Sequence, residues 1–255
     1  MSTEHSGNPG LTPPAGPHGM LVVDKPLGPS SMQMCRIVKR RLINGGAPKG
    51  VKVGHGGTLD PLATGVLVVM VGRATKLCDK VMAGAKQYET QIDLSAFSTT
   101  DDAEGERTIV SVDVPPDLQT VQAACAKFVG TIMQKPPIYS AIKIDGQPAY
   151  KAARQGLGDS LKLTARPVRV DGIAVVRYEW PTLMLLVDCG KGVYIRSLAR
   201  DIGTTLGTGG MLTALRRTRV GMFDIADAST PDAMANVLTE ADLLPLAAFV
   251  ADASE

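Results

Sequence analysis

Residues 54–65 read GHGGTLDPLATG, and the continuous apolar run from Gly65 to Val71 follows directly. Such a run predicts a fully buried strand. The glycines permit positive φ angles or a close approach to a ligand, and Pro61 holds Asp60 in an extended conformation. We therefore expect a rigid carboxylate at the rim of a core strand. The segment is not a Walker loop, because no Gly-Lys-Ser/Thr follows. A tight turn in which Asp60 only caps a neighbour stays open as the alternative.

Helix and strand patterns are mixed on both sides of this segment, without a regular βαβ repeat. Besides the run above, β-branched and apolar content predicts strands at Gly19–Val23, Gln87–Leu94, Pro167–Tyr178 and Leu183–Cys189. Apolar spacing near 3.6 residues predicts helices from Ser30 or Ser31 to about Ile43, at Thr75–Met82, at Leu118–Phe128 and at Ile195–Leu206. This mixture favours an α+β fold with a largely antiparallel sheet.

The composition is that of an ordinary globular protein, with 44% apolar and 20% charged residues in 255. The four cysteines lie far apart, which disfavours a zinc cluster or a disulfide framework and predicts reduced thiols in a cytosolic protein. No apolar run approaches the roughly 20 residues that span a membrane. Residues 1–18 lack a signal-like stretch, so we expect a disordered leader and a cytoplasmic location.

Charge is distributed unevenly along the chain. Lys25 to Leu59 contains seven Lys or Arg and no acidic residue, whereas the seven acidic residues from Asp224 onwards have no Lys or Arg among them. Residues 1–223 therefore carry a net charge of +9. A basic body suits a polyanionic partner such as RNA. A solvated basic face that keeps the protein soluble is the alternative.

Several separated motifs, in the same order along the chain, resemble those of the TruB family, the bacterial synthases that make pseudouridine at tRNA position 55. Residues 54–65 are similar to the family motif GHTGTLDPxATG. The other matching segments are VDKP at 23–26, KQYE at 86–89, QKPPIYSAIK at 134–143, AYKAAR at 149–154, GVYIRSL at 192–198 and LRR at 215–217. The resemblance covers about Gly19 to Phe223. It implies the pseudouridine synthase fold, a large, mostly antiparallel mixed sheet flanked by helices.

The resemblance also implies the chemistry. Asp60 would be the catalytic carboxylate that initiates exchange of the glycosidic bond of uridine 55; whether it attacks the sugar or the base, or deprotonates the sugar, stays open. Arg196 resembles the arginine that pairs with this aspartate, and a guanidinium can hold both oxygens bidentately. Tyr88 resembles the tyrosine beside the flipped base and would assist proton removal from C5. Leu215 would form an apolar wall. The structural alternatives are an exposed salt bridge for Arg196, a cross-strand aromatic for Tyr88 and a core residue for Leu215.

Other residues are expected to contact the RNA. The target uridine must leave its stack to react, and His55 resembles the family histidine that occupies or stabilises the vacated space. Lys25, Lys143, Tyr194 and the basic helix around Arg36–Arg41 are candidates for backbone or substrate contact. The expected partner is the T-arm stem-loop of tRNA, with no protein partner, and the expected state is a monomer. The isomerisation involves no redox step or external group, so neither cofactor nor metal is expected.

Two departures from the family pattern stand out. Gly56 occupies the position where the family usually has Thr, so a side-chain contact is absent there. Only about thirty residues follow Phe223, which is too few for the family's RNA-binding PUA domain, and they are acidic. The composition at Ala226–Thr230 is typical of a linker and precedes the acidic tail. We therefore expect a catalytic domain at residues 19–225 and an acidic extension at residues 226–255.

Two other classes of function are alternatives to an isomerase. One is an RNA-binding or tRNA-folding module in which catalysis is secondary, a role that can coexist with catalysis. The other is a nucleoside hydrolase or glycosidase, which needs a second positioned carboxylate or metal ligands. The sequence near Asp60 offers neither.

Overall fold

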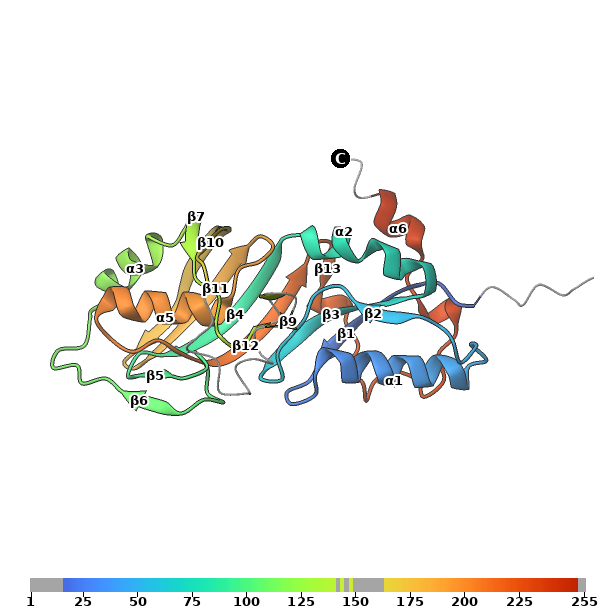
Figure 1. The fold of residues 1–255 in the computed structure, drawn as a ribbon, viewed down its shortest axis with the longest axis horizontal. Coiled ribbons are helices and arrows are strands. Elements are labelled where there is room, and N and C mark those ends of the chain that lie inside the picture. Colours follow the sequence, from blue (N-terminus) through green and yellow to red (C-terminus); the bar gives the residue numbers. More distant parts are fainter. Residues whose placement is uncertain (1–15, 141–142, 145–146, 149–162, 252–255) are drawn as a thin grey trace, which may run out of the picture.

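A computed structural model describes residues 16–140, 143–144, 147–148 and 163–251 (Figure 1). Its centre is a nine-stranded sheet in the order β1-β3-β12-β4-β11-β10-β7, with β2 on β3 and β13 on β12. The strands are β1 Gly19–Lys25, β2 Val53–His55, β3 Ala63–Val71, β4 Lys86–Asp93, β7 Gly130–Gln134, β10 Arg166–Glu179, β11 Thr182–Cys189, β12 Met211–Val220 and β13 Phe223–Asp224. The pair β3–β12 is parallel and the other pairs of this sheet are antiparallel. The expected α+β fold with a mostly antiparallel mixed sheet is confirmed.

The helices flank this sheet, and two two-stranded ribbons lie beside it. The helices are α1 Ser31–Asn44, α2 Cys78–Ala83, α3 Leu118–Ala126, α5 Ile195–Leu206 and α6 Leu246–Ala251, with 3-10 turns η1 Gly72–Leu77, η4 Ile225–Asp227 and η5 Glu240–Asp242. The ribbons pair β5 Ala96–Ser98 with β6 Arg107–Ile109 and β8 Lys143–Ile144 with β9 Gln147–Pro148. No helix in the described ranges is long and apolar enough to cross a membrane.

Strand β3 is buried on both faces, which explains its unbroken apolar sequence. Leu67 and Val69 belong to the core cluster under α1, whereas Val66 and Val68 belong to the cluster under α2. A third cluster fills the space between α5, α3 and the other half of the sheet. Tyr88 of β4 packs against the first and third of these clusters. The boundary between the two halves of the sheet therefore runs through the predicted site.

Local sequence explains how α1 starts beside this boundary. Ser30 is the N-cap, and its hydroxyl accepts from the backbone N–H of Gln33 while the Gln33 side chain accepts from the N–H of Ser30. This reciprocal capping box satisfies two donors that the first helical turn leaves free. The cap thus fixes the start of α1 at Ser31, whose own hydroxyl is buried and bonds to the backbone of Leu59.

The segment after residue 225 lies against the edge strand β1. The N–H of Asp24 donates to the carbonyl of Ser229 at 3.0 Å, and the N–H of Met20 donates to that of Leu244 at 3.0 Å. Leu238 is buried in the cluster under α1. These contacts cover an edge that would otherwise present unpaired backbone groups. Residues 1–15 of the expected leader and residues 252–255 lie outside the described ranges.

Candidate active site

A cavity of about 250 Å³ opens where the two halves of the sheet meet. It is lined by the loop 57–60, Met82 of α2, strand β4, Ser140, the segment 190–196 that leads into α5, and strand β12. The side chains that concern the chemistry are Asp60, Lys86, Tyr88, Tyr194, Arg196, Leu215 and Arg217. Five of the eight individually predicted site residues, from segments far apart in the sequence, are therefore brought together.

Asp60 stands on a rigid support immediately before β3. Both backbone groups of Leu59 bond to the Ser31 hydroxyl, which donates to the carbonyl at 2.9 Å and accepts from the N–H at 2.8 Å. The carbonyl of Asp60 accepts from the N–H of Ala63 at 3.0 Å. The Asp60 side chain remains 40% exposed. The carboxylate is thus held from behind and open toward a ligand.

Lys25 is buried beneath this loop, and its predicted role as a contact for RNA stays a prediction. Its side chain is 0% exposed, and its ammonium donates to the carbonyls of Pro26, Pro29 and Pro61 at 3.0, 2.8 and 3.4 Å. Burial lowers the pKa of Lys25 to about 8, while the negative charge of Asp60 acts in the opposite direction. The lysine therefore ties the turn after β1 to the Asp60 loop.

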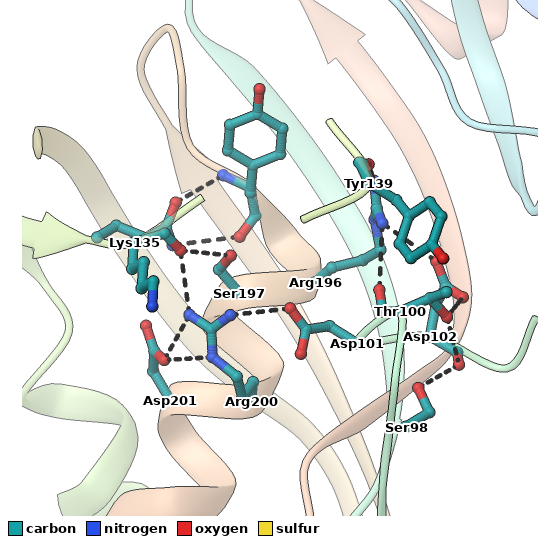
Figure 2. Close-up of polar contacts among 12 residues, drawn as sticks. Ser98, Thr100, Asp101, Asp102, Lys135, Tyr139, Arg196, Ser197, Arg200 and Asp201 are labelled. Carbon is teal, nitrogen blue, oxygen red and sulfur yellow. Dashed lines mark hydrogen bonds and ion pairs between the residues drawn. The ribbon is translucent and has the colours of Figure 1, made fainter. Parts of the chain in front are cut away.

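Arg196 enters the cavity from the first turn of α5 and pairs with Asp60. Its Nη2 lies 2.8 Å from Oδ2 of Asp60, and its Nη1 lies 3.4 Å from Oδ2 of the buried Asp102. The same guanidinium donates to the carbonyls of Thr100 at 3.1 Å and Tyr139 at 2.8 Å (Figure 2). The contact with Asp60 is therefore made by one nitrogen and one oxygen, not by the bidentate fork that we expected.

Tyr88 and Arg217 lie directly opposite each other on the paired strands β4 and β12. Burial raises the pKa of Tyr88, and the Arg217 guanidinium opposes this shift. Arg217 is 2% exposed, and it donates to the carbonyls of Val66, Thr58 and Gly57 at 2.8, 3.4 and 3.2 Å. It therefore joins β12 to the loop that carries Asp60. From the sequence, Arg217 was expected only as part of the LRR motif and of the basic stretch 216–219 that would contact phosphate, because its burial cannot be read from the sequence.

Leu215 and Tyr194 also line the cavity. Leu215 is half-buried between the two core clusters and forms an apolar part of the wall. The backbone of Tyr194 is held by the buried Gln134, whose side chain accepts from the N–H at 2.8 Å and donates to the carbonyl at 3.2 Å. The guanidinium carbon of Arg166 lies 5.6 Å from the centroid of the Tyr194 ring, a cation–π distance. Tyr194, the N-cap residue of α5, is thus held in place through both its backbone and its ring.

The remaining predicted contacts lie elsewhere or outside the described side chains. His55 is half-buried on β2 and is not among the residues described as lining the cavity. Burial lowers the pKa of His55, and Arg217 lowers it further, so the imidazole is neutral near pH 7. Lys143 has a described backbone in β8, but its side chain lies outside the described part. On α1, Arg36 and Arg40 are exposed, whereas Arg41 donates to the carbonyl of Met234 at 3.3 Å.

The structure explains why glycine stands at position 56. A Cβ placed there would lie 2.3 Å from Cγ1 of Val81 on α2, which is far inside van der Waals contact. The backbone N–H of Gly56 meanwhile donates to the carbonyl of Val68 at 2.8 Å. The space that a larger side chain would need at this position is filled by Val81.

Asp102 is the second carboxylate near Arg196, but it is not among the residues found to line the cavity. It accepts from the backbone N–H of Glu104 at 3.0 Å and contacts Nη1 of Arg196, whereas Asp60 contacts Nη2. In the described ranges, no group of three or more His, Cys, Asp or Glu side chains is arranged to hold a metal ion.

Comparisons with known proteins agree with this architecture. The model of the TruB family pseudouridylate synthase N-terminal domain matches residues 41–195, and that of the tRNA pseudouridylate synthase B C-terminal domain matches residues 196–251. The tRNA pseudouridine synthase B of Gluconacetobacter diazotrophicus is 46% identical over 92% of this chain and 76% of its own length. That of Xanthomonas axonopodis pv. citri is 43% identical over 92% of this chain and 75% of its own.

Solved structures show the same fold in larger proteins. A chain in the crystal structure of a Cbf5-Nop10-Gar1 complex is 30% identical with a TM-score of 0.63, covering 83% of this chain and 52% of that one. A chain in the structure of an H/ACA RNP bound to a substrate RNA containing 2'-deoxyuridine is 26% identical with a TM-score of 0.59, covering 86% and 57%. This chain thus spans little more than half the length of those solved chains.

Proposed function

This chain belongs to the TruB family of pseudouridylate synthases, and we propose that it isomerises uridine 55 in the T-loop of tRNA to pseudouridine, with Asp60 initiating the reaction. As a member of this family, the chain is an isomerase that forms pseudouridine in tRNA. The choice of nucleotide and the roles of individual residues are the proposal. The observation that carries them is the placement of Asp60, Arg196 and Tyr88 around one cavity.

The cavity suits a single base that has left its stack. Stacked bases in a folded loop are out of reach of a carboxylate, so the target must be extruded before it can react. The flipped uracil would lie between Tyr88 and the apolar side chain of Leu215, both half-buried at the junction of the two core clusters. The Asp60 side chain lines the cavity and is 40% exposed, so the sugar of the flipped nucleotide could lie next to its carboxylate.

Asp60 and Arg196 would act as a unit. Arg196 is 6% exposed, so solvent only weakly screens the attraction between its charge and the carboxylate of Asp60. Because Asp102 and two carbonyls also contact Nη1 and Nη2 of this guanidinium, Arg196 has little freedom to follow Asp60, and the carboxylate keeps one orientation toward the substrate.

The bond exchange itself is balanced within the substrate. The bond between N1 and C1′ breaks, the uracil turns, and a bond between C5 and C1′ forms; C5 then loses one proton and N1 gains one. Tyr88 is the group that would relay this proton, because its phenol reaches the cavity and burial raises its pKa, which keeps it protonated at neutral pH. Phenol donation to N1 followed by proton removal from C5 restores Tyr88.

The experiment that tests this function maps pseudouridine in an unmodified tRNA transcript after incubation with the purified protein. The expected result is a single pseudouridine at position 55. A transcript with cytidine at that position is the matched control and should remain unmodified. Pseudouridine at other positions alone, or none in any tRNA transcript, would refute the proposed specificity or activity respectively.

A further inference from the structure

Two arginines one helical turn apart on α5 hold the same two segments of the chain. Arg196 and Arg200 are four residues apart and so lie on one face of the helix. Figure 2 shows both side chains directed toward the turn that contains Asp101. The carbonyl of Thr100 accepts from Arg196 at 3.1 Å, and the carboxylate of Asp101 contacts Nη1 of Arg200 at 2.8 Å. The turn is therefore held at two consecutive residues.

Arg200 also joins this turn to the segment that precedes the cavity. Its Nη2 donates to the carbonyl of Lys135 at 3.1 Å, and the same carbonyl accepts from the hydroxyl of Ser197 at 2.9 Å. Asp201 lies 2.9 Å from the same guanidinium. A few residues further along, the carbonyl of Tyr139 accepts from Arg196. Both arginines thus bridge the same two segments, with Arg196 at the cavity and Arg200 one turn behind it.

Asp101 occupies a position from which it controls the partners of Arg196. Its φ angle is +63°, a left-handed conformation that Asp tolerates better than most residues. Its neighbours on either side, Thr100 and Asp102, are the ones that face Arg196. Because the conformation of Asp101 sets the directions of both, any rearrangement there moves two of the groups that orient the guanidinium.

The Asp101–Arg200 pair is better shielded than an ordinary surface pair. Its side chains are 15% and 25% exposed, compared with 72% and 67% for Glu179 and Arg177. Burial raises the pKa of Asp101, while Arg200 and then Arg196 oppose the shift. Without Arg200, the carboxylate would lose its main counter-charge in a partly buried position, which favours movement of the turn toward solvent.

We propose that Asp101 and Arg200 are a positioning pair: by fixing the Thr100–Asp102 turn, they hold Arg196 in contact with Asp60. The proposal rests on the function proposed for Asp60. Neither residue touches the substrate in this account, so losing the pair slows the chemical step and leaves tRNA binding intact. The two residues act through the same turn, so their effects on the rate are not multiplicative.

The kinetic test uses Arg200→Gln, Asp101→Asn and the double variant, because Asn also tolerates positive φ. Single-turnover rates of pseudouridine formation are measured with saturating tRNA, together with the tRNA dissociation constant and the melting temperature. Each single variant is expected to be slower by about tenfold, and the double variant is expected to be no slower than the slower single one. Arg200→Lys, which keeps the charge beside Asp101, should recover part of the rate. Arg177→Gln is the matched control and should match the wild type.

Two kinetic outcomes would overturn the proposal: single variants within about twofold of the wild type, or multiplicative losses in the double variant. A crystal structure of Arg200→Gln, or of Asp101→Asn if the first does not fold, tests the same idea without activity. The distance from Nη2 of Arg196 to the Asp60 carboxylate should then exceed about 4 Å, the limit of an ion pair. An unchanged contact overturns the positioning role even if the wild type proves inactive on tRNA, and inactivity of the wild type refutes only the proposed function.

Discussion

One guanidinium, that of Arg196, is shared by two carboxylates: Nη2 lies 2.8 Å from Asp60 and Nη1 lies 3.4 Å from Asp102. The two aspartates contact different nitrogens of the guanidinium, and of the two only Asp60 is among the residues that line the cavity. The planar, forked shape of arginine is what allows one side chain to serve both. The contacts that orient the Asp60 carboxylate therefore include a group outside the cavity.

Arg196→Lys should be severely impaired although it conserves the charge. A lysine ammonium is a compact point charge and cannot span Asp60 and Asp102 together with the carbonyls of Thr100 and Tyr139. We expect the single-turnover rate to fall by at least about a hundredfold, or 2.7 kcal/mol, with a smaller change in tRNA affinity. A near-normal rate for this variant would show that Arg196 is not the functional partner of Asp60.

Tyr88→Phe tests the proton relay. The substitution keeps an aromatic ring between the core clusters and removes only the hydroxyl, so tRNA binding should persist. Since a positioned acid or base contributes about 10² to 10⁴ in rate, we expect a loss in that range. The control is Tyr178→Phe, because the hydroxyl of Tyr178 donates to the carbonyl of Pro116 at 2.6 Å and does not line the cavity. Equal rates for the two variants would remove Tyr88 from the mechanism.

Two adjacent serines allow the support of the Asp60 loop to be separated from helix capping. Ser31→Ala leaves both backbone groups of the buried Leu59 without their partner, which should cost about 1–3 kcal/mol of stability and also slow catalysis. Ser30→Ala removes only the cap of α1 and should cost about 1 kcal/mol with an unchanged rate. Urea unfolding and single-turnover assays check both. If the two variants have the same rate, the Ser31 bridge does not position Asp60.

Stability should rise between about pH 8 and pH 9. Burial lowers the pKa of both Lys25 and Lys86 to about 8, whereas lysines in the unfolded chain keep their protons to about pH 10.4. In this window the unfolded chain binds more protons than the folded one, so the free energy of unfolding increases, by up to about 1.4 kcal/mol per pH unit for each group.

The rise should stop near pH 9. Burial raises the pKa of Cys35 and Cys125 to about 11 and of Cys189 to about 12, so thiols ionise first in the unfolded chain and stability is lost above that point. Urea unfolding at a series of pH values gives the curve. In Lys86→Met the slope below pH 9 should be less than half that of the wild type, because one lysine contribution is lost and the opposing thiol contribution remains. A flat or falling curve over this range would mean that these ammonium groups are not buried.

Elements governed by local chemistry could be predicted from the sequence. The apolar run of β3 marks a strand buried on both faces, and the serines before α1 mark its first turn. The predicted helix at Thr75–Met82 corresponds to η1 followed by α2, which together begin three residues earlier at Gly72. Asp60 could be singled out because its proline and glycine neighbours restrict the backbone in a way that can be read without tertiary information.

Features that depend on tertiary contacts could not be predicted in this way. Strand β12 was not predicted, because the basic residues in LRRTR suggest a solvated segment, whereas Arg217 is buried among backbone carbonyls. Lys25 was expected only as a candidate contact for RNA, and its burial among backbone carbonyls depends in part on Pro61, which is distant in the sequence. The sharing of Arg196 by Asp60 and Asp102 joins three segments that are distant in the sequence, and no local pattern encodes that meeting.

The measurement that tests the central claim most directly compares wild type and Asp60→Asn on one tRNA transcript, with pseudouridine at position 55 and tRNA binding measured in parallel. Asparagine preserves the size of the side chain and removes its charge. The wild type should convert the site, and Asp60→Asn should bind the transcript with similar affinity but form no pseudouridine above the enzyme-free control. Turnover by Asp60→Asn at more than about a hundredth of the wild-type rate, within 2.7 kcal/mol of it, would contradict the assignment of Asp60 as the initiating carboxylate.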